Sequence, residues 1–230
     1  MVCYNVVVDE DVQTQIDAMT GGLYTIIGDN YSHVGGNMVA QITAANVVTG
    51  FSYGSLNRVL IAFNPTASRV VERCSFTRSQ NNLLSAALSI NGQKLPQREI
   101  KELSTVAGDL GGAEALAEIL IADKCLASFA HGTSFNANGA SSFTRRGADA
   151  DSNTDDGDIG TYMIAIDTER MRGDSDKIYS GINTIGASVQ AQFEFGVASD
   201  ACNIDCFANY TTKFSLDASP NGTRVWTVQV

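Results

Sequence analysis

The last third of the chain alternates apolar and polar residues in three successive runs. Residues 188–195 spell SVQAQFEF, and residues 209–217 and 223–230 alternate in the same way. A period of two places every second side chain on the same side of an extended strand, so one side packs and the other meets water. The pattern therefore predicts three β-strands, each with one buried face. The side chains expected to face inward between two sheets are Phe193, Phe195, Phe214, Leu216, Trp226 and Val228.

A tight turn separates the last two of these runs. Pro220, Asn221 and Gly222 stand between them. Asn-Gly tolerates the positive φ angles that a short hairpin turn requires. The two strands are therefore expected to be antiparallel neighbours.

Apolar runs, several of them rich in β-branched residues, predict further strands in the first two thirds of the chain. These runs cover residues 5–8, 23–27, 38–48, 58–63, 84–90 and 161–167. The run at 58–63, RVLIAF, is apolar on both faces, which is typical of a central strand that is covered on both sides. Asn64-Pro65 ends that run, and Asn91-Gly92 turns the chain after residue 90.

A few segments favour helix instead. Residues 12–19 are expected to form a short helix, and residues 101–107 and 113–126 are rich in helix-forming residues. The last of these segments follows Gly111-Gly112 and has apolar residues at helical spacing, so one of its faces is expected to pack on the sheet. Those apolar residues are Leu116, Ile119, Leu120 and Leu126.

A long stretch without hydrophobic period follows the helical segments. Residues 130–160 are rich in Ala, Ser, Asn, Gly and Asp, and a loop this long inside a compact domain is usually functional or mobile. Helices do not alternate regularly with strands along the chain, so a parallel α/β sheet is not expected. We predict an all-β fold, in which residues 1–230 form one antiparallel sandwich or jelly roll of about eight strands, with one or two short helices inserted mid-chain.

Composition narrows the classes of partner. The 230 residues carry a net charge of -10, and the basic residues are scattered apart from the pair Arg145-Arg146. Phosphate binding needs clustered basic side chains, so nucleic acid is not expected as a direct ligand. Charged residues make up only 17% of the chain, which indicates that part of the surface is buried against partners.

The compartment follows from what the sequence lacks. No apolar run is long enough to span a membrane, and the first residues, MVCYNVVVDED, do not have the pattern of a secretory signal. The five cysteines are irregularly spaced and odd in number, which argues against a disulfide framework and suits a reducing compartment. The protein is therefore expected to be made in a reducing cell interior and not secreted.

One motif points to hydrolase chemistry. Residues 50–54, GFSYG, match the pattern that places a nucleophilic serine, here Ser52, on a strained turn between a strand and a helix. The residues that follow Ser52 read as a strand, so the required context is missing. His131 is the one histidine after the serine. His33 is expected in a polar loop, where it makes a local hydrogen bond. A glycine-bounded loop is the preferred interpretation.

Two further groups resemble metal ligands. An acidic alternation runs from Asp149 to Asp158, but Thr154 stands where a calcium loop of the EF-hand type needs glycine. Cys202 and Cys206 lack a nearby histidine to complete a zinc site, so they are expected to be buried free thiols. We expect a solvated acidic loop at 149–158, no catalytic, cofactor-binding or metal residue, and no enzymatic activity.

The order of several segments resembles a known family. The segments are GGLYTII, YGSLNRVLIAFNP, SINGQKLPQREIK, TYMIAIDTER, SDKIYSGINTIGASVQAQFEF and FANYTTKFSLD. In this order they resemble the C-terminal jelly roll of the double jelly-roll (hexon-like) major capsid proteins of double-stranded DNA viruses, especially those of virophages and polinton-like viruses. The stretch SGINT at residues 180–184, before a long alternating strand, is the most specific of them.

The resemblance implies a structural role in a virion. Such proteins form trimers with a pseudo-hexagonal outline, and these capsomers tile an icosahedral shell. The implied partners are further copies of the chain, neighbouring capsomers and other capsid proteins. The loop at 130–160 would then cap the outer surface or wrap a neighbour in the trimer.

The length departs from the family. Its members carry two jelly rolls in one chain, whereas 230 residues hold one. Met1 stands directly before the first expected strand, so the chain is expected to be half of a two-domain capsid protein or a single jelly-roll minor capsid or penton protein. A jelly-roll carbohydrate-binding module is the alternative from a different functional class.

Overall fold

The architecture was analysed in a computed structural model of the chain. It describes residues 15, 19–20, 23–66, 81–101, 113–122, 163–169, 181–196, 199–218 and 224–229. Within these residues the chain forms nine strands and the helix α2. In chain order the elements are β1 (Leu23–Met38), β2 (Ala44–Val48), β3 (Leu56–Pro65), β4 (Leu83–Ile90), β5 (Gln93–Lys101), α2 (Ala113–Ala122), β6 (Ile164–Asp167), β7 (Val189–Phe195), β8 (Cys202–Ala218) and β9 (Arg224–Gln229).

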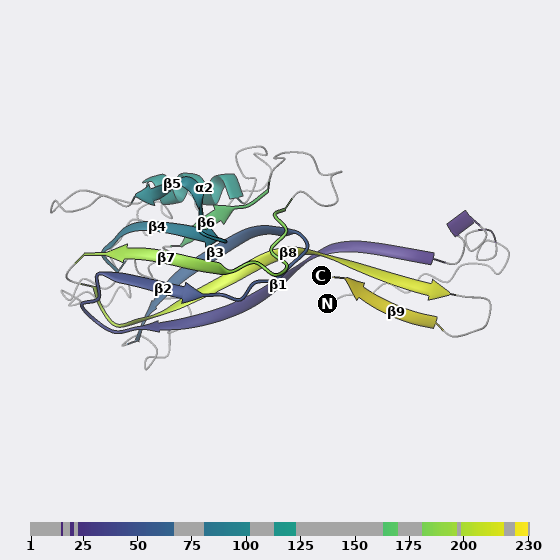
Figure 1. Ribbon diagram of the computed structural model, residues 1–230, viewed down its shortest axis with the longest axis horizontal. Helices are drawn as coiled ribbons and strands as arrows, with labels where there is room; N and C mark the ends of the chain where they lie inside the picture. Colours follow the sequence, from purple (N-terminus) through teal and green to yellow (C-terminus); the bar gives the residue numbers. More distant parts are fainter. Residues whose placement is uncertain are drawn as a thin grey trace, which may run out of the picture.

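The strands form two facing antiparallel sheets (Figure 1). One sheet has the order β1-β8-β3-β6, with β9 added beside β8, and the other has the order β2-β7-β4-β5. Apart from β4–β5 and β8–β9, which pair within one sheet, consecutive strands lie in opposite sheets, so each sheet combines strands that are far apart in the chain. Eight strands connected in this order form a jelly roll, to which β9 is added in one sheet. The predicted all-β antiparallel sandwich is confirmed.

The core lies between the two sheets and follows the alternation in the sequence. Phe63 on β3 packs edge-on against Phe193 and Phe195 on β7, with ring centroids 5.3 and 5.6 Å apart. All three rings are buried. The prediction that Phe193 and Phe195 face inward is therefore confirmed, and the strand expected at 58–63 lies between β8 and β6, as a central strand should.

Helix α2 covers one end of the sandwich beside β5 and β6 (Figure 1). Ala115, Ile119 and Ala122 are buried and recur every three or four residues, which defines the packed face. Ile119 was expected on that face. The side chains of Leu116 and Leu120, and all of Leu126, lie outside the described residues.

Beyond the sandwich, one sheet continues as a projecting arm. We define the arm as residues 23–28 of β1, residues 212–218 of β8 and all of β9 (Figure 1). The hairpin predicted between the last two strands is confirmed, because β8 and β9 pair in antiparallel register with Phe214 opposite Val228.

The predicted burial fails on this arm. Val228 was expected in the core, but it is 56% exposed, and Phe214 and Leu216 are only partly buried. The opposing sheet ends before it reaches these positions, so the alternation continues where there is no second sheet to cover it. The side chain of Trp226 lies outside the described residues.

Several boundaries also differ from expectation. The strand expected at 38–48 is split by a turn at residues 40–41, where Gln41 has a φ of 64°. Strand β5 was not predicted, because Pro96 and the charged residues around it weaken the strand pattern. Lys101, expected to begin a helix, ends β5 instead. The elements predicted at 5–8, most of 12–19 and 102–107 lie outside the described residues, as does the loop at 130–160.

Candidate interaction surfaces

The stretch around Ser52 does not form a hydrolase turn. Ser52 is exposed in the connection between β2 and β3, and the chain runs from it straight into β3. A nucleophile elbow needs a helix after the serine, so the preferred interpretation as a loop agrees with the structure. His131 lies outside the described residues.

His33 occupies a strand rather than the polar loop that was expected. It lies on β1, and its Nε2 atom is 3.0 Å from Oδ1 of Asp205 on the neighbouring strand β8. Its ring also packs at a tilt of 32° against the ring of Phe207, with centroids 4.7 Å apart. The other carboxylate oxygen of Asp205 accepts a hydrogen bond from the side-chain amide of Asn64 on β3. The three polar side chains thus tie β1, β8 and β3 together across the outer face of their sheet.

A second polar cluster lies further along the same outer face. The side-chain amide of Asn57 donates to Oγ1 of Thr211 at 3.0 Å, and it also lies 3.4 Å from Oδ1 of Asn209 and Oδ1 of Asp29. Ser55 donates to Oδ1 of Asn57 at 3.1 Å. Asn57 sits at the irregularity where the register of β3 and β8 shifts. The side-chain hydrogen bonds stabilise β3 and β8 at the position where their ladder of backbone hydrogen bonds is interrupted.

The two described cysteines are inert in the folded protein. Cys202 and Cys206 are buried and free, as expected. Burial disfavours the thiolate and raises the pKa of Cys202 to about 11 and that of Cys206 to about 12. Because the thiolate is the nucleophile and the metal ligand, neither residue offers that chemistry at neutral pH. Among the described residues no cluster of His, Cys, Asp and Glu could hold a metal ion.

We expect iodoacetamide at pH 8 to leave Cys202 and Cys206 unmodified in the native protein. Both thiols are protonated at that pH and are shielded by the sandwich. The same reagent should modify both residues in guanidinium chloride, where burial is lost. Peptide mapping by mass spectrometry reads each site separately. Rapid native labelling of Cys206 would show that the sheets open there.

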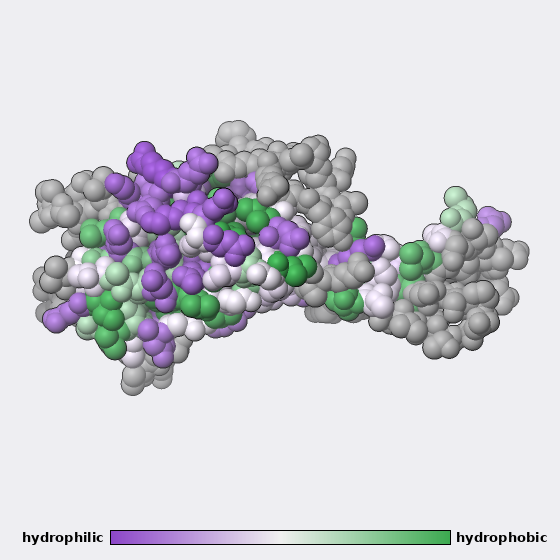
Figure 2. Space-filling view, viewed as in Figure 1, coloured by the Kyte–Doolittle hydropathy of each residue, from purple (hydrophilic) through white to green (hydrophobic). Residues whose placement is uncertain are grey.

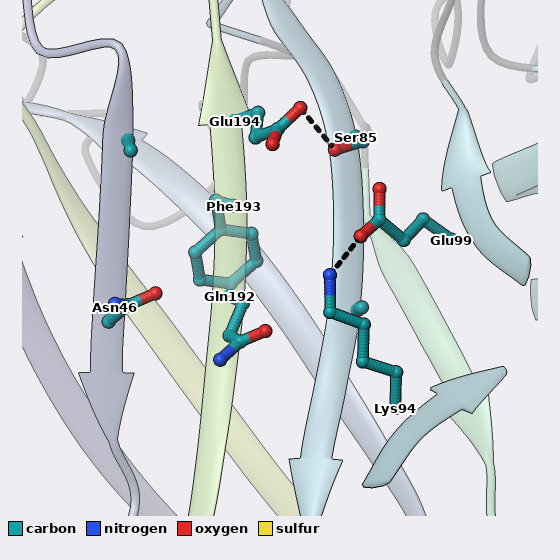
Figure 3. Close-up of a pocket in the computed structure, with 9 residues that line it drawn as sticks. Asn46, Ser85, Lys94, Glu99, Gln192, Phe193 and Glu194 are labelled. Atoms are coloured by element: carbon teal, nitrogen blue, oxygen red, sulfur yellow. Dashed lines mark hydrogen bonds and ion pairs between the residues drawn. The ribbon is translucent and has the colours of Figure 1, made fainter. Parts of the chain in front are cut away.

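A shallow hollow lies on the outer face of the other sheet. It has a volume of about 230 Å³, and the small side chains of Ala44, Ser85 and Ala87 leave room for it. Asn46 on β2 and Gln192 on β7 are direct neighbours across the strands, and their amides point toward the hollow (Figure 3). Neither amide makes a hydrogen bond to another described side chain, so both can bind a partner.

The rim of this hollow carries one basic and two acidic side chains, Lys94, Glu99 and Glu194. Lys94 and Glu99 on β5 form an ion pair, which raises the pKa of Lys94 and lowers that of Glu99. Ser85 donates to Oε2 of Glu194 at 3.1 Å (Figure 3). Figure 2 shows hydrophilic side chains gathered over this sheet. The face can form many weak polar contacts, but it has no concentrated charge to attract a strongly charged ligand.

A second hollow contains two acidic side chains, Asp167 and Glu169. Its volume is about 340 Å³, and its lining includes Asp167, Glu169, Leu95 and Ile182. Sequence reasoning did not anticipate either hollow. Both are built by strands far apart in the chain, and β5, which contributes to each, was missed. The acidic stretch from Asp149 to Asp158 lies outside the described residues.

The described residues contain no helix that is long and apolar enough to cross a lipid bilayer. No protein-family model and no curated protein sequence matches this chain.

Solved structures do match the chain in fold. The crystal structure of VP54 of PBCV-1, fitted into a cryo-EM reconstruction of the virophage Sputnik, matches 95% of this chain with a TM-score of 0.51 and 9% identity. The Sputnik virophage structure matches 91% of the chain with a TM-score of 0.44 and 11% identity. The mavirus major capsid protein matches 91% with a TM-score of 0.38 and 8% identity.

The likeness to VP54 confirms the fold that the sequence resemblance implied. It extends over nearly the whole chain, but this chain covers only 54% of VP54. The chain therefore spans about half the length of that protein.

Proposed function

We propose that this chain is a structural subunit of a virus capsid, corresponding to one jelly roll of a double jelly-roll major capsid protein. The observation that carries the proposal is the jelly-roll strand order, together with a likeness in fold to VP54 over 95% of the chain. The coverage of 54% of VP54 supports a one-domain counterpart of a longer protein. A single jelly-roll minor capsid or penton protein has the same fold and is the nearest variant of the proposal.

The architecture suits a rigid building block. Two packed sheets with an apolar core deform little, and their connections and outer faces are left for contacts. The polar face around the hollow, with the free amides of Asn46 and Gln192, fits the wet contacts found between subunits. In this proposal, copies of the chain or of its two-domain parent form trimers with a pseudo-hexagonal outline. These capsomers tile an icosahedral shell with other capsid proteins.

Location and partners follow from the same proposal. The protein resides in the virion after synthesis inside the host cell. Its net charge of -10 opposes direct contact with the packaged genome, because like charges repel. The protein acts by assembly and does not catalyse a reaction.

The carbohydrate-binding alternative finds less support. Sugar-binding faces combine polar groups with exposed aromatic rings that stack on the sugar. The hollow has the polar groups, but the aromatic residue in its lining, Phe193, is 2% exposed and packs inward against Phe63. The described lining therefore lacks a stacking platform.

Light scattering coupled to size exclusion, followed by negative-stain imaging, tests the assembly proposal. We expect a stable trimer with a triangular or hexagonal outline. If the chain alone is monomeric, co-expression with a first jelly roll should restore the trimer. A monomer that stays monomeric with that partner would contradict the proposal.

A further inference from the structure

Strand β1 forms the edge of its sheet over its whole length of 16 residues. Among the described strands β8 alone pairs with it, in a register that runs from Leu23 opposite Asp217 to Met38 opposite Cys202 without a shift. Figure 1 shows β1 running along the sandwich and on into the arm. One side of a long and regular strand is therefore open to pairing.

The hydrogen bonds show which backbone groups of β1 point away from β8. In an antiparallel ladder, alternate residues direct both their N–H and their C=O to the same neighbour. The amide of Tyr31 donates to Oδ1 of Asn30 at 2.8 Å and not to β8. On β8 the amide of Thr211, which lies opposite Asp29, donates to the carbonyl of Ser55 on the far side of β8. Both observations turn the odd-numbered residues of β1 outward.

The edge of β1 lacks the features that keep other edges from pairing. It contains no Lys, Arg or Pro, and its one acidic residue is Asp29. Proteins protect edge strands by keeping them short or by placing charge or proline on them. Strands β2, β6 and β9 have five, four and six residues, and β5 carries Pro96 between Lys94 and Arg98. Of these edges, β1 is the one that is both long and unprotected.

Apolar side chains flank this edge on both faces of the sheet. Four of the nine large apolar side chains that are exposed among the described residues lie on β1, namely Leu23, Ile26, Ile27 and Tyr31. Because successive side chains alternate, Ile26 lies on one face and the other three lie on the opposite face. An added strand would place its own side chains beside them and remove them from water. The edge therefore fits an extended polypeptide segment of low charge.

We propose that the edge of β1 pairs in antiparallel fashion with the edge of β1 in a second copy of this chain. An antiparallel ladder has a two-fold axis, so one edge supplies the donors and acceptors that an identical edge requires. The same axis brings the apolar side chains of the two copies together on both faces of the sheet. The low charge of β1 permits this approach although the whole chain carries a net charge of -10.

The length of β1 sets the strength of this pair. Pairing along the whole strand would form about 16 backbone hydrogen bonds, because every second residue contributes two, and a typical interface has about 10. An edge about 54 Å long and about 10 Å thick buries about 1,100 Å² over both copies, near the lower end of specific interfaces. The pair is therefore reversible. This inference rests on the proposed function only for its setting, in which the pair joins copies in neighbouring capsomers.

Amide hydrogen exchange at single-residue resolution tests the pairing directly. At low protein concentration the amides of Ile26 and Gly28, which face β8, should be protected, whereas those of Thr25 and Ile27 should exchange rapidly. At high concentration Thr25 and Ile27 should exchange at least tenfold more slowly, because the second copy then binds their N–H groups. Protection of Thr25 and Ile27 that does not change with concentration would mean that something other than a reversible pair covers the edge, and would overturn the proposal.

Substitutions at Ile27 test the same pair by sedimentation velocity. Ile27→Pro removes an outward N–H and leaves the ladder with β8 intact, so it should weaken the association of the main species at least tenfold. Ile27→Lys should have the same effect, because it places a charge in the contact on both copies. Ile185→Lys is the matched control, since Ile185 is also exposed but lies outside the sheets.

The melting temperature of each variant shows whether it has folded. Association lost in both Ile27 variants and retained in Ile185→Lys supports the pairing. Association that both Ile27 variants retain, or wild-type chain that does not associate at any concentration, overturns it. The size of the main species at low concentration is read in the same experiment, so a missing trimer counts against the proposed function and leaves the comparison at Ile27 intact.

Discussion

Phe63→Ala is expected to lower the free energy of unfolding by about 3–5 kcal/mol. Phe63 is 0% exposed and holds both sheets together, because its ring contacts Phe193 and Phe195 of the opposite sheet. Alanine would remove the ring, lose both edge-on aromatic contacts and leave a cavity between the sheets. Urea unfolding followed by circular dichroism measures the loss.

Phe207→Ala provides a matched control in the same sheet. Phe207 lies on the outer face of β8, only partly buried, where its ring packs at a tilt against His33. Its truncation removes a partly solvated ring and opens no closed cavity, so we expect a loss of about 1 kcal/mol. A Phe63→Ala loss as small as that of the control would contradict the inter-sheet position of Phe63.

The sandwich was predictable because its strands carry a strict local signal. The run SVQAQFEF alternates at every position, and β7 buries Val189, Ala191, Phe193 and Phe195 in the same alternation. Burial between two sheets imposes this period directly on the sequence. The fold class and most of the strand positions could therefore be predicted without knowing which strands pair.

The arm shows the limit of that reasoning. Phe214 and Val228 alternate as regularly as Phe193, yet Val228 is exposed. Alternation states that a strand has an apolar face, but it does not state what covers that face. The cover depends on where the opposing sheet ends, and this depends on strand lengths set elsewhere in the chain.

The hollow beside Asn46 and Gln192 could not be predicted for a related reason. Its lining comes from β2, β4, β5 and β7, which are up to about 150 residues apart in the sequence. No local pattern specifies that two amides meet across strands. The hollow also depends on β5, whose strand pattern in the sequence is interrupted by Pro96 and the neighbouring charged residues.

The stretch SGINT, by contrast, was singled out from the sequence, and the structure shows what it does. Ile182 exchanges backbone hydrogen bonds with Leu56, each 2.9 Å long, and the Thr184 amide donates to the carbonyl of Tyr53 at 2.8 Å. The amide of Gly181 donates to Oγ of Ser55 at 3.1 Å. The stretch thus fastens the chain before β7 to the beginning of β3, which joins the two sheets at one end.

Gly181→Ala is expected to destabilise the protein by about 1–3 kcal/mol, the range for forced overpacking. A Cβ atom at this position would lie 2.6 Å from the backbone carbon of Leu56 and from Oδ1 of Asn57, and nearer still to the Leu56 carbonyl oxygen. Backbone atoms cannot rotate away as a flexible side chain can. The Leu56–Ile182 bonds must lengthen or β3 must shift. Thermal unfolding should show the loss as a melting temperature lower by several degrees.

Gly28→Ala is the matched control, because it makes the same chemical change in a strand with open space around it. No atom lies within 4 Å of a Cβ built on Gly28, and alanine costs less backbone entropy than glycine on folding, so stability should rise by about 0.5–1 kcal/mol. The two substitutions are therefore expected to act in opposite directions. If Gly181→Ala were neutral or stabilising, the close approach of SGINT to β3 would be wrong. The hydrogen bonds from Gly181, Ile182 and Thr184 to residues 53–56 would then not be what the SGINT stretch provides.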